Sequence, residues 1–381
     1  MRADVLDHTA LRPRDTAARM LRRPAWRASL KIWLPYIRAG TGADVYTHTL
    51  AAALEQLGQR VVTTPFQHEW QYFPWRLRLE KIPDGTDVIV ANSWNAFAFA
   101  GRGVPVIAVE HHTLVGSGRT AYTNLPQAIF HAVFVKAFLR RSAATAARVV
   151  AVSQHTATSW RRSIGGAEPM VIYNGVDTQY FSPAPSHHRN PERDRFRLLF
   201  VGKPCARKGA DLLPAILSCL GSGFELRCVG GHPLPASLQG HPRVRHLGRL
   251  TLEDLRAEYR HAQLLLAPSR LEGFGLAAAE AMSCGTPVVA SHAHAFRELI
   301  GRDGAGVLCA MDSADDFGRQ IKCLAADPER LSQLSRTSRA RVVQHFSRRR
   351  MASEYLELFR RIVSAPISAE TRAVLPDEGS S

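Results

Sequence analysis

The chain has 381 residues, of which 45% are hydrophobic and 22% charged, and its formal net charge at pH 7 is +16. This length is too great for one ordinary core and predicts two domains, while the composition is typical of a soluble globular protein. The sequence contains no apolar run of about 18 residues and no apolar core of a signal peptide near its start, so we predict a cytoplasmic protein without a membrane-spanning helix.

The first half of the chain alternates between expected strands and helices. A basic extension is expected at residues 1–28. The strands that follow it are expected at residues 29–36, 60–64, 86–91, 104–109, 149–152 and 170–173. A glycine-rich turn and a helix over residues 44–58 join the first two of them. Such alternation predicts a parallel sheet with helices on both faces, and residues 29–177 are therefore expected to form one Rossmann-like domain.

The second half repeats this pattern after a Pro-, His- and charge-rich linker at residues 178–196. Its strands are expected at residues 197–201, 225–229, 244–246, 263–267 and 286–290. Residues 197–346 then form a second Rossmann-like domain, followed by an amphipathic helix within 347–365 and a disordered tail at 366–381. Because ligands bind at the carboxyl ends of such strands, we expect the two domains to face one another across a cleft.

The segment around Glu272 carries the clearest chemistry. A buried strand ends at Ala267, a turn containing Gly273 and Gly275 follows, and a helix begins. A helix N-terminus offers unpaired N–H groups and a partial positive charge, which suits a diphosphate, and glycines let the backbone approach it. Glu272 is placed at the mouth of this site and Glu280 on the first helical turns, where a carboxylate can accept hydrogen bonds from a ribose.

Three cations, Lys203, Arg207 and Lys208, directly follow the strand at residues 197–201. Side chains at a strand's carboxyl end can reach a bound diphosphate and stabilise the charge that develops as a nucleotide leaves. A solvated basic turn is the alternative. Gly42, in the first turn of the N-terminal half, allows close backbone approach to a ligand or simply makes a tight turn.

Taken together, these motifs resemble the retaining nucleotide-sugar glycosyltransferases of family 4, which have the GT-B fold. The resemblance is carried by the spacing of Glu272 and Glu280, by E-A-M-x-x-G-x-P-V-V-A after it, by V-I-Y-N-G-V-D at residues 171–177, and by Arg207-Lys208-Gly209. It covers roughly residues 30–363. The fold that it implies is α/β, with two Rossmann-like domains.

The resemblance implies a role for each principal residue. Lys208 is the phosphate-binding lysine, Glu280 binds the ribose, and Glu272 holds the sugar or the developing positive charge. His111, which closes the strand at residues 104–109, contacts the transferred sugar and supports the transition state, with His112 as the alternative assignment. Catalytic roles are thus predicted for Glu272, His111 and Lys208.

Donor binding is expected to involve further residues. They are Gly42, Lys203, Arg207, Arg249, Gly273, Phe274, Gly275 and Leu276, together with Lys208, Glu272 and Glu280. Lys203 stands where the family often has arginine, and Arg207 is the candidate to supply the missing guanidinium. No cofactor or metal is expected, because lysine and helix dipole take the place of a metal and His111 and His112 lack an evident third ligand.

The predicted function is transfer of a hexose from a nucleotide diphosphate, by default a UDP-sugar, to a glycan or lipid-linked acceptor of bacterial envelope polysaccharide or lipopolysaccharide. The alternatives are a nucleotide-sugar epimerase on the same fold, a basic membrane- or nucleic-acid-binding protein without catalysis, and an inactive scaffold. Neither a recognition helix nor an aromatic stacking platform is evident, so no nucleic acid partner is expected.

The basic charge is concentrated in residues 111–167, which contain seven Lys or Arg and no Asp or Glu. Within them, residues 122–141 combine an apolar, aromatic middle with cations toward the end. Such a stretch can lie on an anionic membrane, which would place the protein peripherally on the inner membrane. A core helix with a basic C-terminal end, or an ordinary solvated basic surface, is the alternative.

Overall fold

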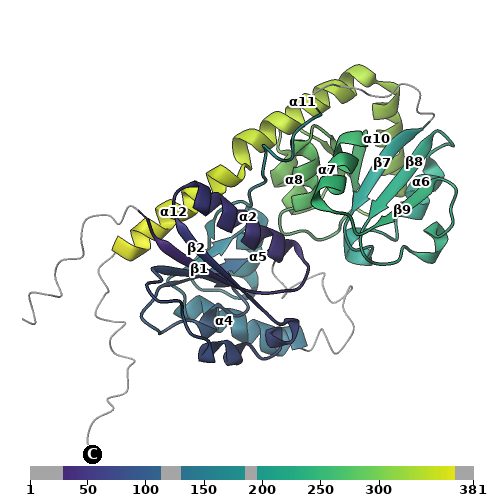
Figure 1. Cartoon of the computed structure of the whole chain (residues 1–381). Helices are drawn as coiled ribbons and strands as arrows, with labels where there is room; N and C mark the ends of the chain where they lie inside the picture. Colours follow the sequence, from purple (N-terminus) through teal and green to yellow (C-terminus); the bar gives the residue numbers. More distant parts are fainter. Residues whose placement is uncertain (1–28, 113–129, 185–194, 365–381) are drawn as a thin grey trace, which may run out of the picture.

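The computed structural model describes residues 29–112, 130–184 and 195–364. They form two α/β units, each with a parallel six-stranded sheet, so the predicted fold class is confirmed. In Figure 1 the first unit runs from purple to teal and the second is green, while the final helix, in yellow, returns to the first unit. The predicted extension at residues 1–28 and the tail at 366–381 lie outside the described residues.

The N-terminal sheet has the strand order β2-β1-β3-β4-β5-β6, and all its pairs are parallel. Its strands are β1 (Lys31–Ile37), β2 (Arg60–Phe66), β3 (Val88–Asn92), β4 (Val106–Glu110), β5 (Arg148–Ala151) and β6 (Met170–Val171). Its helices are α2 (Gly42–Gln56), α4 (Lys136–Thr145) and α5 (Gln154–Ser163), with short helical turns η1 (His68–Gln71), η2 (Pro74–Leu79), η3 (Ala96–Ala98) and η5 (His131–Val135).

The C-terminal sheet has the order β12-β11-β10-β7-β8-β9, again wholly parallel. Its strands are β7 (Phe196–Val201), β8 (Phe224–Val229), β9 (Val244–Gly248), β10 (Leu264–Ala267), β11 (Val288–Ser291) and β12 (Val307–Cys309). The helices are α6 (Leu213–Cys219), α7 (Leu252–His261), α8 (Leu276–Ser283), α9 (His294–Ile300), α10 (Ala314–Ala326) and α11 (Pro328–His345). The edge strand β12 was not expected from the sequence.

Both sheets are covered on two faces, which explains their almost continuously apolar strands. Along β1, Ile32 and Leu34 belong to one buried cluster and Trp33 to another. Along β7, Leu199 belongs to the same cluster as Ile32, whereas Phe200 faces the opposite way. Successive strand side chains point to opposite faces, so a strand buried on both faces has few polar positions. One of these clusters extends through both units.

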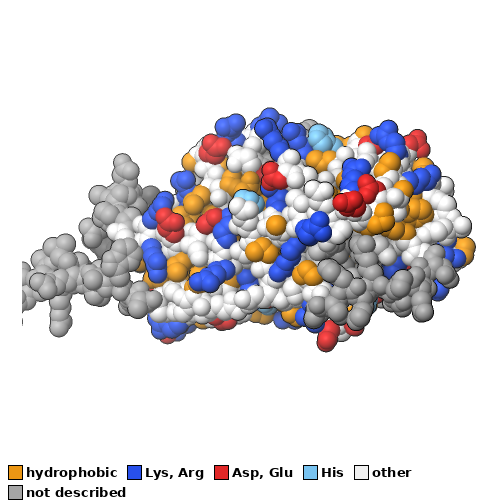
Figure 2. Space-filling view, turned by 90° about the horizontal axis from the view of Figure 1, so that it is seen from above, with side chains coloured by type: hydrophobic (Ala, Val, Ile, Leu, Met, Phe, Trp, Pro, Cys, Tyr) orange, Lys and Arg blue, Asp and Glu red, His pale blue; other side chains and the backbone are white. Residues whose placement is uncertain are grey.

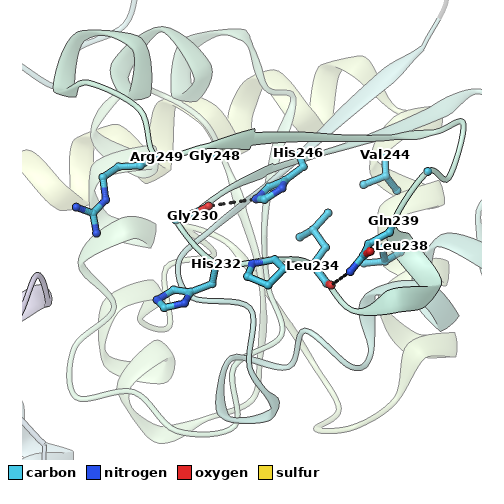
Figure 3. A pocket seen from close by; sticks show the side chains of 12 residues that line it. Gly230, His232, Leu234, Leu238, Gln239, Val244, His246, Gly248 and Arg249 are labelled. Atoms are coloured by element: carbon cyan, nitrogen blue, oxygen red, sulfur yellow. Dashed lines mark hydrogen bonds between the residues drawn. The ribbon is translucent and has the colours of Figure 1, made fainter.

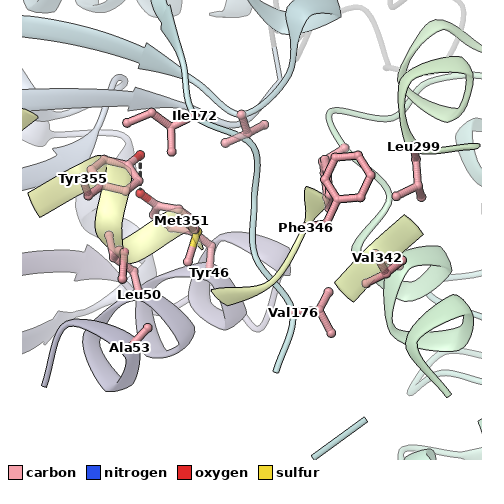
Figure 4. Close-up of a cluster of buried hydrophobic side chains, with 14 of the residues drawn as sticks. Tyr46, Leu50, Ala53, Ile172, Val176, Leu299, Val342, Phe346, Met351 and Tyr355 are labelled. Carbon is pink, nitrogen blue, oxygen red and sulfur yellow. Dashed lines mark hydrogen bonds between the residues drawn. The ribbon is translucent and has the colours of Figure 1, made fainter. Parts of the chain in front are cut away.

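The helix α12 (Arg348–Ser364) joins the end of the chain to the N-terminal unit by packing against α2. Figure 4 shows Tyr46 of α2 and Tyr355 of α12 hydrogen-bonded inside this cluster, with the Tyr46 hydroxyl donating over 2.6 Å. Near the crossing, the Val176 amide donates to the Phe346 carbonyl and the Arg348 amide to the Val176 carbonyl, each over 2.8 Å. Segments far apart in sequence therefore fasten the two units together.

One face of the molecule shows the positive charge in a dispersed form. Figure 2 shows Lys and Arg side chains spread over one face of the molecule, with acidic and apolar side chains among them. Among the residues that the structure describes, no helix combines the length and the apolar character needed to cross a bilayer.

Candidate functional site

The site is built where β10 ends and α8 begins. Gly275 caps α8 with a φ of 97°, a left-handed conformation that favours glycine, and a Cβ there would lie 2.8 Å from the Phe296 ring. No side chain caps this N-terminus. Its first N–H groups therefore have no partner within the helix and form a natural anion site at the carboxyl edge of the sheet.

Lys208 and Glu272 meet beside this helix N-terminus, where Lys208 Nζ forms an ion pair with Glu272 Oε1. The side chains are only 20% and 10% exposed. Burial by itself would raise the pKa of Glu272, but the charges of Lys208 and Arg207 and hydrogen bonds from Lys208 and Ser269 outweigh it and lower the pKa. Glu272 is therefore a charged carboxylate in a position that is largely shielded from solvent.

The turn that carries Lys208 is fixed by its neighbours. Gly209 has a φ of 70°, and a Cβ there would lie 2.1 Å from the Pro268 carbonyl oxygen, so no larger residue fits without a shift. The guanidinium of Arg207 donates from Nη1 to the Leu271 carbonyl over 2.9 Å. Lys203, by contrast, is exposed. The structure thus brings two of the three predicted cations against the Glu272 loop and leaves the third in solvent.

Arg270 connects the same two loops, which the sequence analysis did not anticipate. Its guanidinium makes two hydrogen bonds of 2.7 Å to the Asp211 carboxylate, and its backbone amide donates to the Arg207 carbonyl over 2.9 Å. The hydrogen bond from Arg270 lowers the pKa of Asp211. This bidentate ion pair between Arg270 and Asp211 fixes the position of the Arg207 loop relative to the Glu272 loop.

Glu280 lies on α8 and is buried, 9% exposed. The hydroxyl of Tyr259, from α7, donates to Glu280 Oε2 over 2.8 Å. Burial raises the pKa of Glu280 to about 7, even though the hydrogen bond from Tyr259 acts in the opposite direction. Glu280 can therefore change its charge near neutral pH, and Tyr259 is a partner that the sequence analysis missed.

The N-terminal unit comes into close contact with this site at Gly273. A Cβ on Gly273 would lie 1.8 Å from the His111 carbonyl oxygen and 3.3 Å from the His112 Cβ. The His111 ring packs edge-on to Tyr46, with 4.7 Å between ring centres, and burial lowers its pKa to about 4. His111 is thus a neutral imidazole at physiological pH, whereas His112 is exposed.

Hydrogen bonds from the start of α5 complete the contact between the two units. Ser153 Oγ donates to the Gly273 carbonyl over 2.6 Å. The backbone amides of Gln154 and His155 donate to the Glu298 carboxylate over 2.8 and 2.7 Å. A carboxylate at a helix N-terminus is favourable, so Glu298 ties α5 to the C-terminal unit.

Two predicted binding residues face each other across the same contact. A Cβ on Gly42 would lie 3.6 Å from Leu276 Cδ1, which places the first turn of α2 against the first turn of α8.

Phe274 is buried, with its ring 5.4 Å from that of Phe346. The Phe274 side chain therefore belongs to the hydrophobic core. Its predicted contact with the donor stays a prediction.

A pocket of about 790 Å³ opens in the C-terminal unit beside this contact. Figure 3 shows His232, His246 and Arg249 among the side chains that line it, with His246 Nε2 3.1 Å from the Gly230 carbonyl oxygen. Arg249, exposed and predicted to bind the donor, lies at its end near Gly231. This volume is in the range of small-molecule sites.

Within the described ranges, no group of three or more His, Cys, Asp or Glu side chains is arranged to hold a metal ion. The six cysteines include three that are buried, and all are free thiols.

Curated relatives of this chain are glycosyltransferases. It is 33% identical over 199 residues to a D-inositol 3-phosphate glycosyltransferase of Streptomyces bingchenggensis, covering 44% of this chain and 43% of that protein. It is 29% identical over 304 residues to D-inositol 3-phosphate glycosyltransferase 1 of Catenulispora acidiphila, covering 70% and 69%. With GDP-mannose:cellobiosyl-diphosphopolyprenol alpha-mannosyltransferase of Xanthomonas oryzae the identity is 25% over 277 residues, or 70% of each chain. The first of these alignments thus spans less than half of the relative.

Solved structures match the fold over most of the chain. Sucrose-phosphate synthase from Thermosynechococcus elongatus has a TM-score of 0.75 and 20% identity, covering 88% of this chain and all of that one. The Anabaena protein HepE, solved in complex with UDP and glucose, has a TM-score of 0.70 and 19% identity, covering 87% and 100%.

Two family models match the two halves separately. The model described as Glycosyltransferase Family 4 matches residues 40–180, and the model described as Glycosyl transferases group 1 matches residues 195–327. Each falls on one of the two sheets, and the loops of Lys208 and Glu272 lie within the second match. The chain therefore belongs to the family 4 glycosyltransferases and is an enzyme of that class with the GT-B fold.

Proposed function

We propose that the protein transfers a hexose, with retention of anomeric configuration, from a UDP-sugar to a glycan or lipid-linked acceptor of bacterial envelope polysaccharide or lipopolysaccharide. The observation that carries this proposal is the Lys208–Glu272 pair beside the uncapped N-terminus of α8. It combines, at one sheet edge, positive charge for a diphosphate and a fixed carboxylate for the sugar.

The donor binds along the carboxyl edge of the C-terminal sheet in this proposal. The diphosphate lies at the start of α8, where Lys208 has further N–H donors beyond its bond to Glu272, and Arg207 adds a second positive charge. Glu280 accepts hydrogen bonds from the ribose. The nucleobase extends toward the pocket beside Arg249, which is open enough for an aromatic ring.

The transfer step needs no metal ion in this scheme. The bond between the anomeric carbon and the diphosphate oxygen breaks, and the acceptor hydroxyl oxygen bonds to that carbon on the same face. The leaving phosphate takes the acceptor proton, so charge and atoms balance. Lys208 and the α8 N-terminus stabilise the diphosphate as it gains charge, while Glu272 balances positive charge on the sugar. His111, neutral and beside Gly273, contacts the transferred sugar.

The choice of UDP and of a lipid-linked acceptor draws on relatives of known chemistry. HepE was solved with UDP and glucose, whereas the name of the Xanthomonas relative specifies GDP-mannose and a diphosphopolyprenol acceptor. A polyprenol acceptor resides in a membrane, which supports a peripheral location on the inner membrane.

Thermal stabilisation by a panel of UDP-, GDP- and ADP-sugars tests the donor, because a ligand that binds only the folded state raises the melting temperature. We expect one UDP-sugar to stabilise the wild type and the surface variant Lys322→Met, but not Lys208→Met. Stabilisation by a GDP-sugar alone would replace UDP in the proposal.

Product analysis then separates transfer from its alternatives. Incubation with donor and a polyprenol-diphosphate-linked glycan should extend the glycan and release the nucleotide diphosphate. An altered sugar formed from donor alone would instead identify an epimerase. Stabilisation by none of the nucleotide sugars would overturn the proposed function.

A further inference from the structure

The N-terminal unit carries an exposed apolar patch that neither the sheet nor the candidate site uses. Six of the ten exposed large hydrophobic side chains of the described residues lie in two short segments, and they are between 46% and 88% exposed. We call them, with the cations beside them, the aromatic-basic patch. Its apolar members are Tyr72, Phe73, Trp75, Leu79, Val133 and Phe134.

The two segments form one surface although about sixty positions separate them in the sequence. The Tyr72 ring meets that of Phe130 at 5.5 Å, and Phe130 stacks on Phe134 at the same separation. Trp75 meets Phe138 of α4 at 6.4 Å. The turns η1 and η2 thus lie against η5 and the start of α4. A contiguous apolar area of this kind on a protein surface marks an interaction site.

Positively charged side chains lie on the same two segments as the apolar ones. Two exposed arginines lie on η2, and α4 has three cations and no acidic residue. Within the part of the chain that the structure describes, none of the five forms an ion pair with a carboxylate. These cations are Arg76, Arg78, Lys136, Arg140 and Arg141. Glu69, on η1, is an exposed acid in the same region, so the patch is basic overall rather than purely cationic.

The patch begins at the edge of the sheet that carries His111. Both β2 and β4 run parallel to β1 and β3, and η1 starts at His68, just after β2 ends at Phe66. The opposite side of α4 is buried: Leu139 is 2% exposed, and Ser142 Oγ accepts a hydrogen bond from the Phe97 amide. The helix is therefore anchored, and its exposed side is a stable feature.

We propose that the aromatic-basic patch docks the enzyme on an anionic lipid surface. Tyr and Trp side chains prefer the headgroup region of a bilayer, and nearby Lys and Arg bind anionic headgroups. Leu79 and Val133 offer aliphatic groups suited to the boundary of the hydrocarbon. A second copy of the chain fits less well, because a two-fold interface would bring the five cations against five equal charges. The inference rests on the proposed function in one respect, the lipid-linked acceptor, which docking would bring to the edge that carries His111.

Co-sedimentation of the full chain with vesicles tests this surface. We expect binding to vesicles containing phosphatidylglycerol, little binding to phosphatidylcholine alone, and weakening by salt. The triple variant Arg76→Glu, Arg78→Glu, Arg140→Glu should lower the partition coefficient by at least about 100-fold. Each basic side chain near an anionic membrane contributes about fivefold, and the three new carboxylates add repulsion to their loss.

A matched triple variant on the C-terminal unit, Arg302→Glu, Lys322→Glu, Arg330→Glu, changes the net charge equally and should retain most binding. The double variant Trp75→Ser, Phe134→Ser should also lose binding, whereas Leu252→Ser, Met311→Ser, equally exposed elsewhere, should keep it. Circular dichroism and stabilisation by the donor should be unchanged in all four. That readout keeps the docking surface and the transferase proposal separate.

An equal loss of vesicle binding in the patch triple variant and in the control triple variant would overturn the inference, because binding would then follow net charge alone. So would a stable dimer in light scattering that only the patch variants dissociate, which would assign the surface to a second copy. Binding of single-stranded RNA that the patch variants abolish, without any binding to vesicles, would assign it to nucleic acid.

Discussion

The two halves of the molecule share one architecture but differ at the edge where ligands bind. In the C-terminal half, the carboxyl edge of the sheet carries the buried or half-buried charges of Lys208, Glu272 and Glu280. In the N-terminal half, the corresponding edge carries neutral His111 and the glycine turn before α2. A parallel sheet with helices on both faces therefore fixes where a site lies, but the loops after its strands decide what it can do.

The halves also differ in how they meet. The C-terminal half presents a glycine backbone at residue 273, and the N-terminal half presents the His111 carbonyl and the hydroxyl of Ser153. Close approach of backbones depends on the absence of a side chain, so this contact is sensitive to a single methyl group. Four changes test the comparison, from the largest expected effect to the smallest.

Gly273→Ala should lower kcat/KM for transfer by at least about 1,000-fold. The alanine Cβ would overlap the His111 carbonyl oxygen, so the N-terminal half would have to move away. A displacement of roughly 1 Å at an active site already costs about 100-fold in rate, and this one should be larger. Gly273 has no positive φ, so the effect is steric. Steady-state kinetics with the best donor measure it.

Gly221→Ala and Gly223→Ala are the controls, because a Cβ at either position meets nothing within 4 Å and neither glycine has a positive φ. They should retain wild-type activity. Near-normal activity of Gly273→Ala would mean that the two halves need not approach closely at this point for catalysis.

Lys208→Met should lower kcat/KM by about 100- to 1,000-fold, the usual effect of removing one group aimed at developing charge. It also leaves the largely buried Glu272 without its nearest cation, so the free energy of unfolding should fall by about 1–3 kcal/mol. Adding Glu272→Gln should restore stability without restoring activity. If the double variant recovered activity, Lys208 would serve only to hold Glu272.

Much of this organisation could be predicted from the sequence. Eleven of the twelve strands found in the described residues were expected within a few residues, because strands buried on both faces are apolar runs bounded by turns. The exception, β12, has three residues and pairs only at the sheet edge, and three residues are too few to show a pattern. The family resemblance, carried by the Glu272 and Lys208 loops, is confirmed by the two family models.

What the sequence could not predict are pairs formed over long distances. Arg270 with Asp211, Tyr259 with Glu280, and the α5 N-terminus with Glu298 join positions from 21 to 144 residues apart. Arginine, tyrosine and glutamate are frequent on helices and loops, and no local spacing identifies their partners. The burial of Phe274 also depends on Phe346, which follows the last helix of the C-terminal half. The roles of individual site residues in catalysis stay predictions.

Glu280→Gln sharpens the contrast between a charged C-terminal edge and a neutral N-terminal edge. The folded-state pKa of Glu280 is about 7, above its ordinary value of 4.5, so the folded state binds the extra proton between these values. This contribution to stability is fully present below pH 4.5 and is lost as the pH rises through about 7. Glutamine cannot ionise, so its free energy of unfolding does not fall in this way. The stability of the variant relative to the wild type should therefore increase as the pH rises, by up to about 3 kcal/mol.

Donor binding should show the opposite trend. The ionised carboxylate accepts hydrogen bonds more strongly than the protonated one, so wild-type affinity should rise through neutral pH, and Glu280→Gln should bind about tenfold more weakly at high pH. Tyr259→Phe removes the hydrogen bond that lowers the pKa of Glu280, and its affinity profile should move to higher pH. Titrations of donor binding at several pH values, carried out on the wild type, Glu280→Gln and Tyr259→Phe, measure this. Identical affinity profiles in all three proteins would remove Glu280 from the ribose site.

The smallest effect is expected where α12 joins the two halves. Tyr46 and Tyr355 are 3% and 0% exposed, and each hydroxyl has the other as its partner. Tyr355→Phe leaves the Tyr46 hydroxyl buried without its acceptor, which should cost about 1–2 kcal/mol, whereas replacing both tyrosines by phenylalanine should cost less than either single change. Denaturant unfolding of the four proteins measures this. A double variant destabilised by the sum of the single changes would show that the two hydroxyls contribute independently, and that their mutual hydrogen bond does not help to hold the last helix to the first half.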